Sequence, residues 1–120
     1  MKSRIFIVPA VTALALLSGA AHAAEDQYAK IARVYNTYCV QCHGINRDGN
    51  GINSANLSVK PRDHTDKSMN DTPDDELRTA IKEGGAAVNK SVLMPRWEGV
   101  LSDAEISDMI GYLRYVSKKQ

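Results

Sequence analysis

Apolar residues recur at helical spacing in three segments of the chain, which predicts three amphipathic helices. The first covers about residues 26–38, the second begins within residues 72–76, and the third opens at residues 102–105. The third helix has the longest apolar stripe, which consists of Ile106, Met109, Ile110, Leu113 and Val116. No segment of useful length alternates apolar and polar residues. The predicted fold is therefore all-α, with three main helices and long loops.

Polar and glycine residues at the predicted helix ends support these boundaries. Thr72 is expected to cap the second helix, with Pro73 at the first helical position and acidic residues in the first turn. Gly84 and Gly85 follow its last turn. The pattern Ser-x-x-Glu at residues 102–105 predicts a capping box for the third helix.

Glycines in one loop and in the third helix lead to further predictions. Arg47-Asp48-Gly49-Asn50-Gly51 has the residue types of consecutive tight turns. Gly111 lies inside the third helix, where it lowers helix propensity, so we expect a close contact between helices there.

The N-terminal 23 residues have the pattern of a secretory signal peptide. Lys2 and Arg4 precede an apolar run over residues 5–17, and the small residues at 21–23 fit cleavage after Ala23. The run is shorter than the ~20 residues that a membrane-spanning helix needs. We expect a signal peptide at residues 1–23, export to the periplasm, and a domain at residues 24–120 with no stable membrane insertion. Retention of the leader as an anchor is the alternative.

Charge and size narrow the class of protein further. Cleavage would remove Lys2 and Arg4, leaving thirteen basic against fourteen acidic side chains and a formal charge of −1. Nucleic-acid-binding domains normally carry a basic excess, so no nucleic-acid partner is expected. The remaining chain has the size of one small domain, and its only phenylalanine, Phe6, leaves with the leader. A bound cofactor would supply much of the missing apolar centre.

Both cysteines of the chain lie in Cys39-Val40-Gln41-Cys42-His43, the attachment pattern of a c-type haem. Thiols at i and i+3 lie on one side of a helical turn, where they can bond the two vinyl groups of one porphyrin. His43 is then an axial iron ligand. A bare Cys-x-x-Cys also occurs in redox pairs, disulfides and zinc sites. The chain lacks a strand–helix–strand pattern and a second ligand pair, so we predict one haem c bound through Cys39 and Cys42.

A second axial ligand is needed, and four residues of the mature chain could supply it: His64, Met69, Met94 and Met109. Met94 precedes Pro95, which keeps this methionine out of a helix and in a loop. Met109 fits the core face of the third helix. Met69 and His64 lie in polar stretches, where we expect packing for Met69 and solvent exposure for His64. His64 is the rival ligand to Met94.

The chain resembles the class I c-type cytochromes, especially small bacterial mono-haem members, over residues 26–117. The likeness rests on the haem motif and on blocks at residues 48–51, 60–63, 81–85, 91–95, 101–106 and 111–114. In that family the methionine before the proline is the distal ligand, so the resemblance implies iron ligation by His43 and Met94. It also places Arg62 and Trp97 near the haem edge, where they can donate to the propionates. The alternatives are an ion pair of Arg62 with Asp63 and a core role for Trp97.

An iron with two protein ligands has no open coordination position, which leaves one-electron transfer as its chemistry. We expect an electron carrier between redox proteins, with no catalytic residues. A shell of apolar residues is expected to limit water: Ile52, Leu57, Ile81 and Leu93. The alternatives are a haem protein that binds small molecules or reduces peroxide, and a cytochrome subunit of a larger oxidoreductase. Lys90, Arg96 and the acids within residues 71–76 are candidate docking charges.

Overall fold

The computed structural model describes residues 15–118, and their regular structure is helical. The α-helices are α1 (Ala15–Tyr38), α2 (Val40–His43), α3 (Asp74–Glu83) and α4 (Asp103–Lys118). Short 3-10 turns interrupt the loops at η1 (Ser54–Asn56), η2 (Lys67–Asp71) and η3 (Gly85–Val88). Within residues 15–118 no strand forms, and a single isolated bridge joins Glu98 to Leu101. The predicted all-α fold with three main helices and long loops is confirmed.

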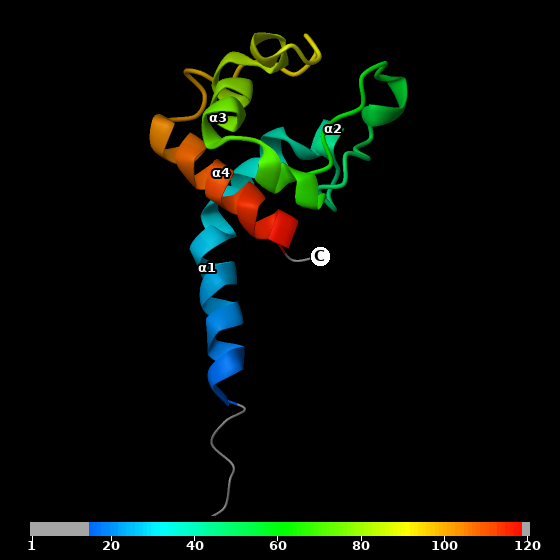
Figure 1. Ribbon diagram of the computed structural model, residues 1–120. Helices are drawn as coiled ribbons and strands as arrows, with labels where there is room; N and C mark the ends of the chain where they lie inside the picture. The colour runs from blue at the N-terminus through cyan, green and yellow to red at the C-terminus, as the bar shows by residue number, and fades with distance from the viewer. Residues whose placement is uncertain (1–14, 119–120) are drawn as a thin grey trace, which may run out of the picture.

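The first helix is longer than predicted. It begins at Ala15 rather than near residue 26, because the intervening segment is rich in alanine and contains no proline. In Figure 1 the N-terminal part of α1 projects away from the rest of the molecule. The basic start of the predicted leader, with Lys2 and Arg4, lies outside the described residues. Of the helices in residues 15–118, none combines the length and the apolar character needed to cross a membrane.

Helix α4 is the element against which the others pack. It contacts α1, α3 and η2, and Figure 1 shows it crossing the end of α1 below α3. Its predicted apolar stripe is buried, as are core residues of the other elements: Ile31, Tyr35, Met69, Ile81 and Leu101. Burial of each large apolar side chain stabilises the fold by about 1.5–3 kcal/mol. The sequence pattern of α4 therefore identified the centre of the core correctly.

The contact predicted at Gly111 is present. A Cβ atom built on Gly111 would lie 3.5 Å from the ring of Tyr28 on α1. This is an ordinary van der Waals distance, so the contact between α1 and α4 does not require glycine.

The start of α4 is as predicted, whereas the start of α3 is not. The Ser102 N–H donates to the Glu105 carboxylate over 3.0 Å, and the Glu105 N–H donates to Ser102 Oγ over 3.2 Å, which forms the capping box. At α3, Pro73 rather than Thr72 is the cap residue. Pro73 has an extended backbone with ψ of 148°, and its carbonyl accepts the first helical bond from Leu77. The prediction of a Thr72 cap is therefore wrong by one residue.

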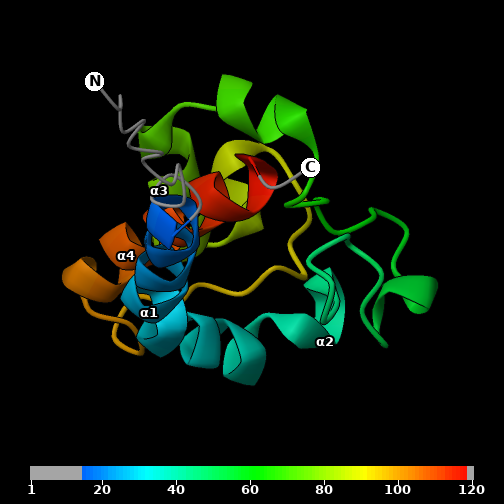
Figure 2. The ribbon, with the colours of Figure 1, turned by 90° about the horizontal axis from the view of Figure 1, so that it is seen from below.

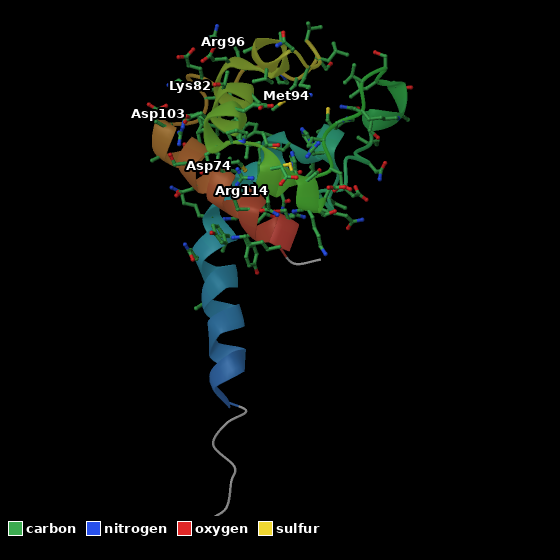
Figure 3. All side chains as sticks on the ribbon, viewed as in Figure 1. Asp74, Lys82, Met94, Arg96, Asp103 and Arg114 are labelled. Atoms are coloured by element: carbon green, nitrogen blue, oxygen red, sulfur yellow. The ribbon has the colours of Figure 1, made fainter. Side chains whose placement is uncertain are left out.

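Arg114 ties α4 to the segment that leads into α3. Its guanidinium donates to the carbonyls of Met69 and Thr72 and pairs with the Asp74 carboxylate, which lies beside it in Figure 3. The side chain of Arg114 is 20% exposed, whereas that of Asp74 is 66% exposed. Because exposed ion pairs contribute little, the two carbonyls are the more important partners.

Replacing Arg114 by methionine is expected to lower the free energy of unfolding by about 1–3 kcal/mol, because two carbonyls lose a charged donor. Urea denaturation of the intact protein measures this change. Arg78→Met is the matched control, since Arg78 donates to Ser107 Oγ at the surface, and should change stability by less than about 0.5 kcal/mol. Equal losses in the two variants would contradict a special role for Arg114.

Candidate functional site

A cavity of about 610 Å³ lies inside the helical fold. Its volume is within the range of about 300–1,000 Å³ typical of ligand and cofactor sites. Figure 2 shows α2 on one side of the molecule and α3 with α4 on the other, and residues from all three helices line the cavity. The walls also include every site residue predicted from the sequence: Cys39, Cys42, His43, Arg62, Met94 and Trp97.

The cysteine motif forms a helical turn that directly continues α1. The Cys39 N–H donates to the Tyr35 carbonyl over 2.8 Å, and the His43 N–H donates to the Cys39 carbonyl over 2.9 Å. Cys39 and Cys42 are half-buried free thiols that line the same cavity. Helical bonding through the motif therefore places both thiols and the His43 imidazole at one wall, as the spacing predicted.

The pKa of Cys39 is relevant to the two alternative interpretations of the motif, a redox-active cysteine pair and a zinc site. Burial, followed by the proximity of Cys42, raises the pKa of the Cys39 thiol to about 12. Redox-active and metal-binding cysteines act as thiolates and usually have a lowered pKa. Within the described part of the chain, no cluster of three or more His, Cys, Asp or Glu side chains is arranged to hold a metal ion. The Cys39 thiol is thus protonated at neutral pH, and the described residues lack the ligand cluster that a zinc site needs.

The predicted turns at residues 47–51 pack against this helical turn. The Gly49 N–H donates to the His43 carbonyl and the Gly51 N–H donates to the Cys42 carbonyl, each over 2.9 Å. A Cβ atom on Gly51 would lie closer than 3.0 Å to backbone atoms of α2. Glycine is therefore required at this position for the turn to approach the motif.

His43 is oriented by a backbone carbonyl. Its Nδ1 lies 3.0 Å from the Arg62 carbonyl oxygen, and donation from Nδ1–H leaves Nε2 as the nitrogen for a metal. Burial lowers the pKa of His43, which favours the neutral imidazole that binds metals. A carbonyl partner does not depend on the side chain at residue 62, so the sequence contained no signal for it.

His64 is buried, and the prediction that it is exposed to solvent is wrong. Only 8% of the residue is exposed, and its ring stacks on His43 with a centroid distance of 4.2 Å and an angle of 19°. Its Nδ1 lies 3.0 Å from the Tyr35 hydroxyl, which satisfies the buried nitrogen. Burial, with His43 and Arg62 as further causes, lowers the pKa of His64 well below its usual value. Because the two rings lie against each other, His64 is not placed to bind a metal from the side opposite His43.

The Arg62 side chain turns toward η2. Its Nε donates to Met69 Sδ over 3.3 Å, and its Nη2 donates to Ser68 Oγ over 2.7 Å. Asp63 accepts from Thr65 instead, so the alternative ion pair between Arg62 and Asp63 is not formed. Met69 is fully buried, in agreement with the predicted packing role.

Met94 is held at the cavity wall by the two glycines after α3. The Gly85 N–H donates to the Met94 carbonyl over 3.1 Å, and the Met94 N–H donates to the Ser91 carbonyl over 3.3 Å. Gly84 has a φ of +91°, a conformation that favours glycine. A Cβ atom on Gly85 would lie closer than 3.0 Å to the Ser91 carbonyl oxygen. The glycine pair thus ends α3 and also shapes the Met94 loop, which is labelled in Figure 3.

Trp97 is half-buried beside the cavity. Its ring packs on Tyr38 with a centroid distance of 5.1 Å. The backbone N–H of Trp97 donates to the Ile81 carbonyl over 3.1 Å. Tyr38 and Lys60 also line the cavity and were not among the predicted site residues. Tyr38 directly precedes the cysteine motif, whereas Lys60 lies in a loop that the sequence did not place beside the cavity.

The predicted apolar shell is partly correct. Leu57, Ile81 and Leu93 line the cavity, but Ile52 does not and is 81% exposed. Ile52 follows Gly51 on the turn before η1, and the close approach of Gly51 to α2 leaves this part of the turn at the surface.

Two ion pairs within the described residues involve candidate docking charges: Arg96 pairs with Glu98, and Asp74 pairs with Arg114. Lys90 lines the cavity next to the Met94 loop.

The part of the chain that matches a known family contains the residues that line the cavity. Residues 26–113 match the family model described as cytochrome C oxidase, cbb3-type, subunit III. A search of curated proteins found no significant match. The match supports a c-type cytochrome domain in general, and not specifically the small class I branch that the sequence blocks resemble.

Substituting Gly85 by alanine is expected to lower the free energy of unfolding by about 1–3 kcal/mol, because the new methyl group overlaps the Ser91 carbonyl. Urea denaturation measures the loss, and faster amide hydrogen exchange at Met94 should accompany it. Gly111→Ala is the control, because its Cβ meets only ordinary contacts. The control should be neutral or up to about 1 kcal/mol more stable. A Gly85→Ala variant as stable as the control would contradict the steric argument.

Proposed function

The chain belongs to the family of the cytochrome c oxidase, cbb3-type, subunit III model, and from this premise we propose that it is an exported one-electron carrier. In this proposal one haem c is bound covalently through Cys39 and Cys42, and its iron is ligated by His43 and Met94. The observation that carries it is the convergence of these four side chains on one cavity of cofactor size.

The residues at the cavity fit such a group. Cys39 and Cys42 are free thiols on one helical turn, as two thioether bonds to a single porphyrin require. His43 has its Nδ1 engaged by the Arg62 carbonyl and its Nε2 available. Met94 comes from the separate segment between η3 and α4. Trp97 and Arg62 at the cavity wall would supply donors for the propionates.

A bound haem supplies a one-electron couple between ferric and ferrous iron. His43 and Met94 would be the residues that hold the iron, and two protein ligands would leave no open site for dioxygen or peroxide. A thioether ligand from Met94 would favour the ferrous state relative to a second imidazole. Leu57, Ile81 and Leu93 contribute an apolar wall that excludes water. No side chain in this arrangement is assigned a catalytic step.

The signal-peptide pattern predicted at residues 1–23 supports export to the periplasm, where other redox proteins would be the partners. Val92 and Leu93 are 79% and 60% exposed beside the cavity-lining Lys90. A small apolar patch with a neighbouring charge suits the limited interfaces of transient redox complexes, which are often below ~1,200 Å².

A permanent place in a larger assembly is the second candidate function. The description of the matched family favours it, since it names a subunit of a cbb3-type oxidase. Fractionation of native cells distinguishes the two functions. A free carrier is released with the periplasmic fraction, whereas a subunit co-migrates with an oxidase complex after detergent extraction.

Covalent attachment is tested by expressing the full chain in a host with cytochrome c maturation. The purified protein should be coloured and should keep its haem through acid–acetone extraction. Cys39→Ser and Cys42→Ser should each leave one thioether, with a red-shifted reduced pyridine spectrum, and the double variant should lose the haem on extraction. A colourless wild-type protein, or full extraction of its haem, would overturn the proposal.

Replacing Met94 by leucine is expected to abolish the sulfur-to-iron charge-transfer band of the ferric protein and to allow rapid carbon monoxide binding by the ferrous protein. Met69→Leu and Met109→Leu are the matched controls, because both residues also line the cavity but are buried in the core. Each exchange nearly conserves volume and should cost less than about 1.5 kcal/mol of stability. A band that survives in Met94→Leu and disappears in a control would reassign the ligand.

A further inference from the structure

In the cavity wall, three aromatic side chains form a continuous series that ends at His43. The Tyr35 and His64 rings meet edge to face at a centroid distance of 5.8 Å, and the His64 and His43 rings stack at 4.2 Å. The Tyr35 hydroxyl and His64 Nδ1 are 3.0 Å apart. Tyr35 and His64 are both buried, so this contact is shielded from water.

Two independent contacts act on the His43 ring. The Arg62 carbonyl accepts a hydrogen bond from Nδ1, at the edge of the ring. The His64 ring covers one face, nearly parallel to it at 19°. The first contact allows rotation about the hydrogen-bond axis, and the second restricts that rotation.

Contacts with Tyr112 and Arg47 hold the Tyr35 ring in place. Its ring meets Tyr112 at a centroid distance of 5.8 Å, and the Arg47 guanidinium carbon lies 5.2 Å from its ring centre. Arg47 Nε donates to the Tyr112 hydroxyl over 2.6 Å, and the Arg47 carbonyl accepts from the His64 N–H over 2.7 Å. Both ends of the Tyr35–His64 contact are therefore anchored by the same residue.

We propose that Tyr35 and His64 are positioning residues that set the ring orientation of His43 and thereby tune the reduction potential of the site. The inference rests on the haem ligation proposed above. The hydrogen bond between the Tyr35 hydroxyl and His64 Nδ1 fixes the plane of the His64 ring, and stacking transmits this orientation to His43.

A purely apolar packing role would not require these residue types. Burying an imidazole and a phenol costs free energy unless each is hydrogen-bonded. In this structure the two groups satisfy each other, and a hydrogen bond is directional where apolar contacts are not. The pair can therefore hold a ring in one plane, which an aliphatic side chain of similar volume cannot do.

The direction of the effect follows from the chemistry of the ligand. A well-aligned Nδ1–H···O bond makes a metal-bound imidazole more basic. A more basic ligand stabilises ferric iron and lowers the reduction potential. When the stacked ring is lost, His43 rotates more freely, its bond to Arg62 weakens, and the potential rises.

The test uses the covalently loaded protein and three variants, namely His64→Leu, Tyr35→Phe and the double variant. His64→Leu should raise the reduction potential and shift the g-values of the ferric electron paramagnetic resonance spectrum, which report the plane of an axial imidazole. Tyr35→Phe keeps its ring and should cause a smaller shift in the same direction. Because Tyr35 acts through His64, the double variant should match His64→Leu, a non-additive result.

Tyr28→Phe is the control, because it also removes a hydroxyl from α1 but Tyr28 packs on Tyr112 and Tyr115 rather than on His64. It should leave the g-values and the potential unchanged. Unchanged values in His64→Leu, or in Tyr35→Phe if His64→Leu does not fold, would overturn the inference. A Tyr35 effect that persists in the His64→Leu background would also overturn it. A wild-type protein without covalent haem, or without a low-spin ferric spectrum, would instead mark failure of the proposed function.

Discussion

One helical turn, from Cys39 to His43, constrains the rest of the site. Its backbone bonds continue those of α1, and they direct two thiols and an imidazole toward the same cavity. The turn is also the point where distant loops converge. Gly49 and Gly51 bond to its carbonyls, and the Arg62 carbonyl accepts from its histidine. Displacement of this turn would therefore disturb the first helix, the tight turns and the loop at residues 60–64 together.

Some side chains belong both to the buried core and to the cavity wall. The stability of the fold and the geometry of the cavity are therefore coupled. Met69 and Met109 belong to the buried core and also line the cavity. Arg114 on α4 holds the Met69 carbonyl, and Met69 in turn contacts the Arg62 side chain. A small helical domain has little apolar material of its own. Shared use of the same side chains lets one set of contacts hold both the helices and the cavity walls.

The family match covers residues 26–113, and all residues that line the cavity lie within this range. The match establishes a cytochrome c domain, and its description names a subunit of a cbb3-type oxidase. The cavity lining contains two neighbouring thiols, one oriented imidazole, a thioether from another segment and apolar side chains. The polar pair of Tyr35 and His64 behind the imidazole is a feature of this chain that the family description does not convey. The proposed tuning of the reduction potential would act through this environment of His43.

The sequence by itself determined the features that depend on short-range spacing. The all-α fold, the stripe of α4, the capping box at Ser102 and the placement of Cys39 and Cys42 on one turn follow from periods of three to four residues. The start of α1 was misjudged because no residue between 15 and 26 ends a helix, and the start of α3 because Pro73 itself serves as the cap. Only the tertiary structure decided the burial of His64, the outward position of Ile52 and the bond from His43 to the Arg62 carbonyl. These depend on how loops far apart in the chain pack together, and that packing follows from the summed contacts of the whole fold rather than from any local pattern.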